Sequence, residues 1–408
     1  MADSEQDVLV ERLGRYPADR YPVQHATTQF HLGSLRLHAG QTGPALLALA
    51  AALDGFERAG LRLERAKAQV MLGAAFRTAG RQDDALDAFT SAAAAFEALG
   101  QPAEQAAACY NLGLVLGDGG RPEAAGAAWS QACTLFFAAG YPGQASAAAR
   151  DHGALLLATG SWAEALPLLD RALGLAETAR SEPAVGAAAN GLGLAHLAAG
   201  DVAAALAVLG RALAAYPRSV LPAEHAMVKA NLALAYEHQG NPARARLAAR
   251  QALGVASVGL SVREQAAALL ARLPGGADAD LLSVLDAETQ ENWPALLREE
   301  IVRIAELPSG QPSDELRPIL SGLLTRPGAA YDLAEALLQV VIEMAPPSYQ
   351  RLVAAIVDAC SGRPVEDTDR LRAVLGSAMA RFAIPQWQRL AAALNAAAES
   401  AGQSAGWQ

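Results

Sequence analysis

The strongest constraint on the fold of this chain is a spacing of 40 positions at which its small residues return. Two glycine columns and two alanine columns keep this spacing through six copies without an insertion. Their members are Gly33, Gly73, Gly113, Gly153 and Gly193, with Ala233 sixth; Gly40, Gly80, Gly120, Gly160, Gly200 and Gly240; Ala45, Ala85, Ala125, Ala165, Ala205 and Ala245; and Ala52, Ala92, Ala132, Ala172, Ala212 and Ala252. Such a fixed period is the signature of a solenoid, in which each repeat stacks on its neighbours.

Each copy carries the apolar pattern of two helices. In the third copy, residues 112–119 place small and apolar side chains at the i, i+3, i+4, i+7 spacing of one helix face. Gly120 then ends this helix, because glycine takes the left-handed cap conformation without steric cost. A second stripe runs through residues 125–136 and ends in an aromatic side chain. Two helices approach closely only where one has almost no side chain, so Gly113 and its equivalents are predicted to mark the helix crossing.

This pattern, a Leu-Gly pair followed at fixed intervals by Gly, Ala, Ala and an aromatic residue, resembles the tetratricopeptide repeat (TPR) in a 40-residue, extended-helix form found in bacteria. The resemblance implies an all-α, right-handed superhelical solenoid of about six helix-turn-helix repeats, followed by an α-helical C-terminal domain. The fourth copy departs from the pattern at His152 and Ala176, and the sixth at Ala256. The predicted array covers 22–275, with repeats at about 22–60, 61–100, 101–140, 141–180, 181–220 and 221–260 and a capping helix at 261–273.

The flanking segments lie outside the 40-residue register. Residues 1–21 are predicted to form an N-terminal helix or cap, 276–400 a helical C-terminal domain, and 401–408 a frayed tail. From residue 276 onward, 18 acidic residues stand against 10 arginines. We interpret this excess mainly as a solvated helical surface, with docking of a basic partner as the alternative.

Composition disfavours several classes of function. A net charge of −10 and a pI near 5.3 argue against a nucleic-acid partner, whose binding needs clustered Lys and Arg. The first residues lack the apolar core of a signal peptide, and the uncharged stretch 183–200 contains proline and four glycines, so a cytoplasmic protein without membrane contact is expected. The three cysteines lack metal-ligand spacing and are interpreted as free thiols. Arginine supplies nearly all positive charge, which indicates a high-GC bacterial genome.

Neither a catalytic constellation nor a metal site is predicted, and the chain is not expected to be an enzyme. His25, His31 and His38 recur every seven residues, about two helical turns apart, too far for shared ligation. The triplet Arg150-Asp151-His152 is not interpreted as catalytic, because consecutive helical residues point in different directions. No cofactor is implied.

Candidate binding residues come from polar columns on the first helix of each repeat. The two positions before the Leu-Gly pair, with Arg77 one turn beyond Gly73, supply Asn111, Arg150, Asn231, Asn190, Tyr110, Arg77 and His31. In peptide-binding TPR proteins an Asn directly before this pair often clamps the peptide backbone, so the resemblance implies that role for Asn111 and Asn231, with Asn190 one position off. Arg150 is suited to an acidic group or a C-terminal carboxylate. The alternative is that these side chains make solvated or inter-repeat hydrogen bonds.

The leading hypothesis is a scaffold that binds a protein or peptide segment in the concave TPR groove, with a homodimer through the C-terminal domain left open. One alternative is a peptide-responsive intracellular regulator resembling TPR pheromone receptors. Another is an accessory protein or enzyme with a pocket in the C-terminal helical domain. The sequence does not identify the partner.

Overall fold

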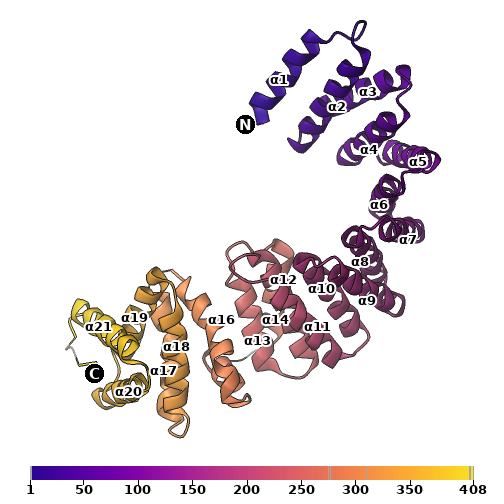
Figure 1. Cartoon of the computed structure of the whole chain (residues 1–408). Helices are drawn as coiled ribbons and strands as arrows, with labels where there is room; N and C mark the ends of the chain where they lie inside the picture. Colours follow the sequence, from indigo (N-terminus) through magenta and orange to yellow (C-terminus); the bar gives the residue numbers. More distant parts are fainter. Residues whose placement is uncertain (1, 274, 276, 309, 404–405, 408) are drawn as a thin grey trace. The chain divides into compact units, whose positions relative to one another are not determined.

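The chain folds into helices joined by short turns (Figure 1). The computed structural model describes residues 2–273, 275, 277–308, 310–403 and 406–407, and this part of the chain contains no β-strand. It divides into two compact units, Met1–Ala215 and Tyr216–Gln408, here called the N-terminal unit and the C-terminal unit. The predicted all-α, helix-turn-helix fold is confirmed. No described helix combines the length and apolar character needed to cross a membrane.

The N-terminal unit repeats a pair of helices on the predicted register; each has 17 residues except α11, which has 14. Within each pair the first is called the A helix (α2, α4, α6, α8 and α10) and the second the B helix (α3, α5, α7, α9 and α11). The bounds are α1 Ala2–Arg15, α2 Pro22–His38, α3 Thr42–Arg58, α4 Arg62–Thr78, α5 Gln82–Ala98, α6 Pro102–Asp118, α7 Pro122–Ala138, α8 Pro142–Ala158, α9 Trp162–Thr178, α10 Glu182–Ala198 and α11 Val202–Ala215. Helix α1 stands in the register of the B helices. Several A helices begin with proline, whose missing N–H costs nothing in the first turn.

Glycine in the left-handed region ends the helices. Gly120 has a φ of 69°, its N–H bonds to the Gly117 carbonyl at 3.1 Å, and the next N–H, of Arg121, bonds to the Leu116 carbonyl at 2.9 Å. The same arrangement closes the other A helices, as the second glycine column predicts. The fourth B helix ends instead at Arg180, which has a φ of 52° without being glycine. Such a conformation costs about 1–2 kcal/mol in a residue with a Cβ.

The first glycine column marks the crossing of each A helix with its own B helix. A Cβ added at Gly153 or at Gly193 would lie 2.6 Å from the Cγ of the leucine opposite it, Leu169 or Leu209. At Gly113 the opposing side chain is Trp129, whose Nε1 would lie 2.6 Å from the added Cβ. These distances are far inside van der Waals contact, so the predicted reason for the glycine column is confirmed.

The A helices line the inner side of the N-terminal unit. Besides packing on its own B helix, α4 touches both α2 and α6, and α8 touches α10. In the described part of the unit, the B helices of adjacent repeats have fewer contacts with one another than these A helices do. Closer spacing in the A layer curves the stack toward that layer, so side chains on the exposed stripe of the A helices face the concave side.

The C-terminal unit contains the sixth repeat and the helices that follow the register. Its elements are α12 Pro222–His238, α13 Pro242–Leu253, α14 Leu260–Arg272, α15 Ala277–Asp286, the 3-10 turn η1 Gln290–Asn292, α16 Trp293–Ala305, α17 Gln311–Thr325, α18 Ala330–Glu343, α19 Pro346–Cys360, α20 Val365–Met379 and α21 Ile384–Ser400. Helix α14 lies where the capping helix was predicted. The boundary between the two units, at 215–216, is defined by where contacts between helices are fewest. The domain boundary predicted from the sequence, at 275–276, is defined by where the 40-residue register ends.

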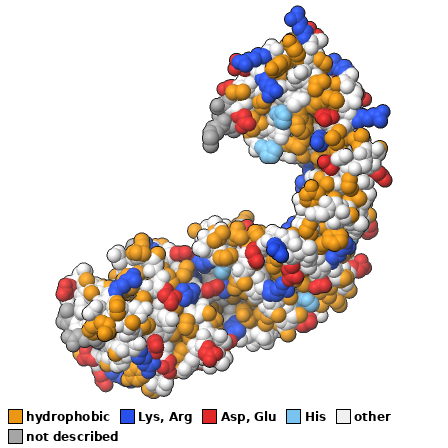
Figure 2. All heavy atoms as spheres, viewed as in Figure 1, with side chains coloured by type: hydrophobic (Ala, Val, Ile, Leu, Met, Phe, Trp, Pro, Cys, Tyr) orange, Lys and Arg blue, Asp and Glu red, His pale blue; other side chains and the backbone are white. Residues whose placement is uncertain are grey.

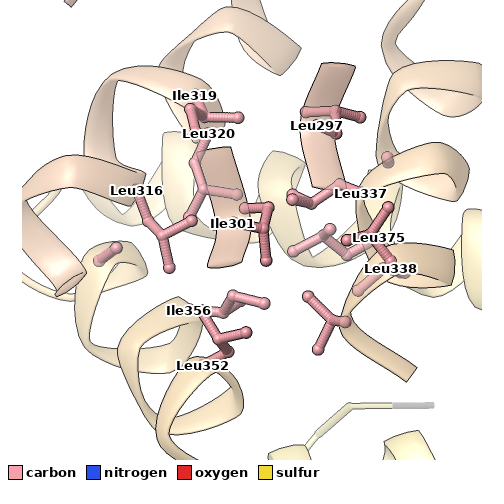
Figure 3. Packing of buried hydrophobic residues seen from close by; sticks show 14 of the residues in the cluster. Leu297, Ile301, Leu316, Ile319, Leu320, Leu337, Leu338, Leu352, Ile356 and Leu375 are labelled. Atoms are coloured by element: carbon pink, nitrogen blue, oxygen red, sulfur yellow. The ribbon is translucent and has the colours of Figure 1, made fainter. Parts of the chain in front are cut away.

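From α15 onward, each helix packs chiefly on the helix two positions further along the chain. The pairs α15–α17, α16–α18, α17–α19, α18–α20 and α19–α21 form two layers. Between the layers lies a continuous core of branched aliphatic side chains, including Ile301, Leu320, Leu337 and Ile356 (Figure 3). Branched residues replace the alanines of the repeats here, which accounts for the loss of the 40-residue spacing.

Much of the acidic excess after residue 276 is used inside the C-terminal unit. Carboxylates of α15 to α16 and their flanking turns meet basic side chains of residues 218–250, a set here called the seam. Its ion pairs are Arg218–Glu306, Lys229–Glu299, Arg244–Glu288, Arg246–Asp280 and Arg250–Asp280. Elsewhere on α16 to α21, acidic and basic side chains are interspersed on the face in view (Figure 2). The sequence analysis predicted a solvated surface or a docking surface for these acidic residues. It did not predict the ion pairs of the seam, which connect the sixth repeat to the helices after it.

Part of the segment 401–408 that was predicted to be frayed is packed in the structure, which describes residues 401–403 and 406–407 of it. Trp407 is only 2% exposed and joins the core cluster of the C-terminal unit. The side chain of Asn395 on α21 hydrogen-bonds the backbone of Gly406 and Trp407. Burial of the large indole offsets the entropy of ordering the residues around it.

Candidate peptide-binding site on the A helices

Three of the predicted site residues meet in one polar cluster on the A helices of repeats two to four. The phenol of Tyr110 on α6 donates a hydrogen bond to Asp151 Oδ2 on α8 at 2.6 Å. Arg150 donates to the other oxygen of the same carboxylate through Nε at 3.0 Å and Nη2 at 2.8 Å. Asp151 thus holds Tyr110 and Arg150 together across two repeats.

Arg77 extends this cluster toward the second repeat. Its Nε on α4 donates to Asp118 Oδ2 on α6 at 2.8 Å, and both Arg77 and Arg150 act electrostatically on the Tyr110 phenol. Arg77–Asp118 and Tyr110–Asp151 are each separated by 41 residues, one repeat plus one position. We call these five side chains the Tyr110 cluster. Two members of the cluster, Asp118 and Asp151, were not predicted as site residues.

Arg150 and Asp151 of the charged triplet form an ion pair although they are consecutive on helix α8. The Cα–Cβ bonds of the two residues point in different directions, but the arginine side chain is long enough to fold back to the neighbouring carboxylate. His152 turns the other way and packs against Gly126 of α7, where an added Cβ would lie 2.5 Å from its Nε2. Burial there lowers the pKa of His152, and its Nδ1 lies 3.2 Å from Ser130 Oγ.

The Tyr110 phenol is held in its protonated form. Burial, followed by the hydrogen bond to Asp151, raises its pKa from 10.0 to about 12. The folded state binds this proton more tightly than the unfolded state does, so Tyr110 contributes stability that is complete below about pH 10 and is lost as the pH rises through about 12.

We therefore expect Tyr110 to ionise well after the exposed tyrosines in an alkaline titration followed by tyrosinate absorbance. Replacing Tyr110 with phenylalanine should lower the amplitude of the late ionisation by one phenol, whereas Tyr349, whose pKa is also raised by burial, should still ionise late. Tyr141→Phe, which removes an exposed phenol of the same unit, should leave the late amplitude unchanged. A late amplitude that is unchanged in Tyr110→Phe would contradict the assignment.

The remaining predicted site residues have other surroundings. Asn111 is half-buried, and its Nδ2 donates to the carbonyl of Ala107 one turn earlier at 2.8 Å. His31 is exposed, and its ring packs edge-on against Phe30 at 5.6 Å. Asn190 is buried within α10, away from the open surface. Asn231 is buried in the C-terminal unit, where its Oδ1 accepts a hydrogen bond from Gln265 of α14 at 3.1 Å.

Asn231 therefore takes part in the packing of α12 against α14. The arrangement matches the inter-repeat hydrogen bond that the sequence left as the alternative to a peptide clamp. Asn395, which the sequence analysis did not single out, hydrogen-bonds the chain's own backbone at Gly406 and Trp407 through both its amide nitrogen and its amide oxygen. The 40-residue register ends before α21, so no column pointed to it.

The histidines and cysteines are accounted for by local packing. His25 and His38 each contact a backbone carbonyl through Nδ1, of Tyr16 at 2.9 Å and of Ser34 at 2.7 Å. Cys109, Cys133 and Cys360 are buried free thiols, and burial raises the pKa of each, that of Cys360 to about 11. A search of the described residues finds no group of three His, Cys, Asp or Glu side chains placed to hold a metal ion.

Two open grooves lie in the C-terminal unit. One, of about 840 Å³, runs between α19 and α21 and is lined mainly by alanines, with Tyr349 and Arg389 among its polar residues. The other, of about 500 Å³, lies along α17 beside Leu282 and includes Arg317 and Arg326. The guanidinium of Arg326 is bound to Asp286, which raises the pKa of Arg326 and lowers that of Asp286.

Comparison with known proteins agrees with the repeat geometry. Two family models, both described as tetratricopeptide repeat, match residues 143–218 and 190–258. No curated protein matches the chain.

Similar solved structures share only low sequence identity with this chain. They include BtubC from P. vanneervenii, at 18% identity and a TM-score of 0.47, covering 52% of this chain and 90% of that one. Kinesin light chain TPR-like repeats from Podosopora anserina show 18% identity and a TM-score of 0.41, covering 48% and 96% of the two chains. The apo form of RapI shows 12% identity and a TM-score of 0.47, covering 64% and 90%.

The family assignment rests on the two family matches and on the helix pairs themselves. The matched residues fall in the fourth to sixth copies of a 40-residue register that the earlier copies share, and glycine marks the helix crossing in the first five copies. TPR arrays are interaction scaffolds, in which stacked helix pairs build an extended binding surface. Residues 143–258 therefore match the tetratricopeptide repeat family, and the helix pairs before them continue the same register.

Proposed function

We propose that the inner face of the N-terminal unit binds a segment of a partner protein, with the Tyr110 cluster as the centre of the site. The observation that supports this most is the gathering of Arg77, Tyr110 and Arg150 on three successive A helices. The side chains of Arg77 and Arg150 keep 39% and 33% of their surface exposed. Each guanidinium has five N–H donors, more than its one carboxylate partner takes up, so donors remain for a ligand.

The half-buried Asn111 lies beside Tyr110 on the same helix and adds an amide to the surface. Mixed donors of this kind suit a peptide backbone together with acidic side chains. The B helices would then act as the support that fixes the spacing of the A helices.

The test compares native complexes of three forms of the full chain by quantitative mass spectrometry. The site variant replaces Arg77, Asn111 and Arg150 with alanine. The control variant replaces Arg58, an exposed arginine of B helix α3 paired with Asp54, and therefore also loses positive charge. We expect a partner protein to be retained by wild type and control and depleted at least about tenfold in the site variant, since about 1.4 kcal/mol suffices for that change. Equal retention by all three forms would rule out this face.

A second candidate is binding of a small molecule in the α19–α21 groove. The volume of about 840 Å³ lies in the range typical of ligand pockets, and six of the twelve lining residues are alanines. Native mass spectrometry of the purified chain would reveal a retained ligand, and Ala396→Trp should displace it by filling the groove.

A further inference from the structure

The ring of His225 on α12 is buried where the sixth repeat meets α16. Only 4% of this residue is exposed, and its Nδ1 lies 2.9 Å from the backbone carbonyl of Tyr216. Because a carbonyl only accepts hydrogen bonds, this contact places the proton of the neutral ring on Nδ1. The other nitrogen, Nε2, is then an acceptor, and within the described residues it has no hydrogen-bond partner.

Charged side chains of the seam surround this nitrogen. Oε1 of Glu299 on α16 lies 3.5 Å from Nε2, but the Glu299 carboxylate is already paired with Lys229 of α12. Arg218, in the turn before α12, is a second cation that acts on the ring, and it is paired with Glu306 at 2.5 Å. The two cations and the two carboxylates therefore balance as long as His225 is neutral.

The turn after α13 adds an apolar wall to this group of charges. Val255 and Val258 pack on Ala226, the residue next to His225 in α12. A proton on Nε2 would add a third cation to a buried set that holds only two carboxylates. Water screens such a charge poorly, so the added cation is costly.

The effect of this proton on stability has a definite sign. Burial lowers the pKa of His225 from 6.5, and the cations Lys229 and Arg218 also lower it. The Tyr216 carbonyl and Glu299 act in the opposite direction without reversing the shift. The unfolded chain therefore takes up the proton at a higher pH than the folded chain does. Neutral His225 contributes stability that is present above pH 6.5 and is lost as the pH falls through the folded pKa.

We propose that His225 makes the seam acid-sensitive, so that protonation of its Nε2 loosens the attachment of α16 to the sixth repeat. The sixth repeat and the helices after it have largely separate apolar cores, although Leu247 of α13 reaches into the later one. Buried ion pairs between two such cores add little net stability, because desolvation offsets their attraction. One extra buried charge is therefore enough to shift the equilibrium. This property goes beyond the proposed binding on the A helices and does not depend on it.

His25 provides a matched control in the first repeat. It lies five periods of the register before His225, and its Nδ1 makes the same contact, 2.9 Å from the Tyr16 carbonyl. Its Nε2 lies 3.4 Å from the amide nitrogen of Gln29, where His225 has the charges of the seam. Glutamine at either position removes the titrating ring and keeps an amide donor for the carbonyl.

The first test measures hydrogen exchange of α16 in the full chain at about pH 7.5 and about pH 5.5, on either side of the ordinary histidine pKa. After correction for intrinsic exchange, we expect protection in wild type to fall by up to about tenfold per pH unit, the limit for one proton. His225→Gln should lose this dependence, and His25→Gln should keep it. Equal pH dependence in wild type and His225→Gln overturns the proposal. Circular dichroism checks that each variant is folded.

The second test follows the His225 ring itself by NMR in the full chain with labelled histidine. We expect His225 to titrate below 6.5 in wild type. Lys229→Gln should raise this pKa because a cation is removed, whereas Glu299→Gln should lower it because a carboxylate is removed. A wild-type His225 that titrates at or above 6.5, or a shift in the same direction in both variants, overturns the proposal. The wild-type titration gives this answer even where a variant does not fold.

Discussion

Replacing Asp280 with alanine should destabilise the C-terminal unit by about 3–5 kcal/mol, the range for removing one partner of a buried ion pair. Asp280 is 1% exposed and accepts hydrogen bonds from Arg246 Nη2 at 2.6 Å and Arg250 Nη1 at 2.8 Å. Its carboxylate raises the pKa of Arg246 chiefly by accepting this hydrogen bond. The variant leaves two guanidinium groups at the seam without their shared counter-charge. Urea denaturation followed by circular dichroism measures the loss.

Two further variants separate charge burial from general damage. Asp332→Ala removes an acid from a surface ion pair with Arg381, in which both side chains are more than 40% exposed, and should cost less than about 1 kcal/mol. Adding Arg246→Ala to Asp280→Ala should restore part of the lost stability, because it removes one of the two uncompensated cations. If Asp280→Ala is as mild as Asp332→Ala, the seam does not hold the sixth repeat to the helices that follow.

Replacing Gly113 with alanine should destabilise the third repeat by about 1–3 kcal/mol, as overpacking does elsewhere. The added Cβ would lie 2.6–2.8 Å from three indole atoms of Trp129, which is 5% exposed and has little room to move. Either the indole leaves its rotamer or α6 moves away from α7. Urea denaturation followed by circular dichroism measures the change in stability.

Gly174 of α9 provides the matched control. It also lies inside a helix, but an added Cβ there meets no other atom within 4 Å. Gly174→Ala should therefore stabilise its helix by up to about 1 kcal/mol, through higher helix propensity and a less flexible unfolded chain. If Gly113→Ala is stabilising as well, the close helix crossing does not explain the glycine column.

The repeat register made the site partly predictable. Tyr110 and Arg150 share one column, and Arg77 lies on the same exposed stripe, so the sequence placed all three on the A helices. Their partners Asp118 and Asp151 could not be paired with them by columns alone. The contacts run between adjacent repeats with a one-position offset that depends on how the helices are tilted.

Asn231 shows the opposite case. Its position in the Leu-Gly column matches that of Asn111, yet α14 packs over it and Gln265 binds its amide oxygen. The column cannot distinguish an open groove from a covered one, because what covers it lies more than 30 residues further along the chain.

The sequence by itself determined the helix pairs, their ends and their crossings, because these depend on residues a few positions apart and recur with each copy. The glycine that ends a helix and the small residue at a helix crossing occur at the same position in nearly every copy. Tertiary structure alone decided the pairing of Arg246 and Arg250 with Asp280, and the burial of Trp407 against α20 and α21. Charged and aromatic contacts of this kind occur once and join distant segments. They follow no period, and only the packing of the folded chain selects one partner among many of the same type.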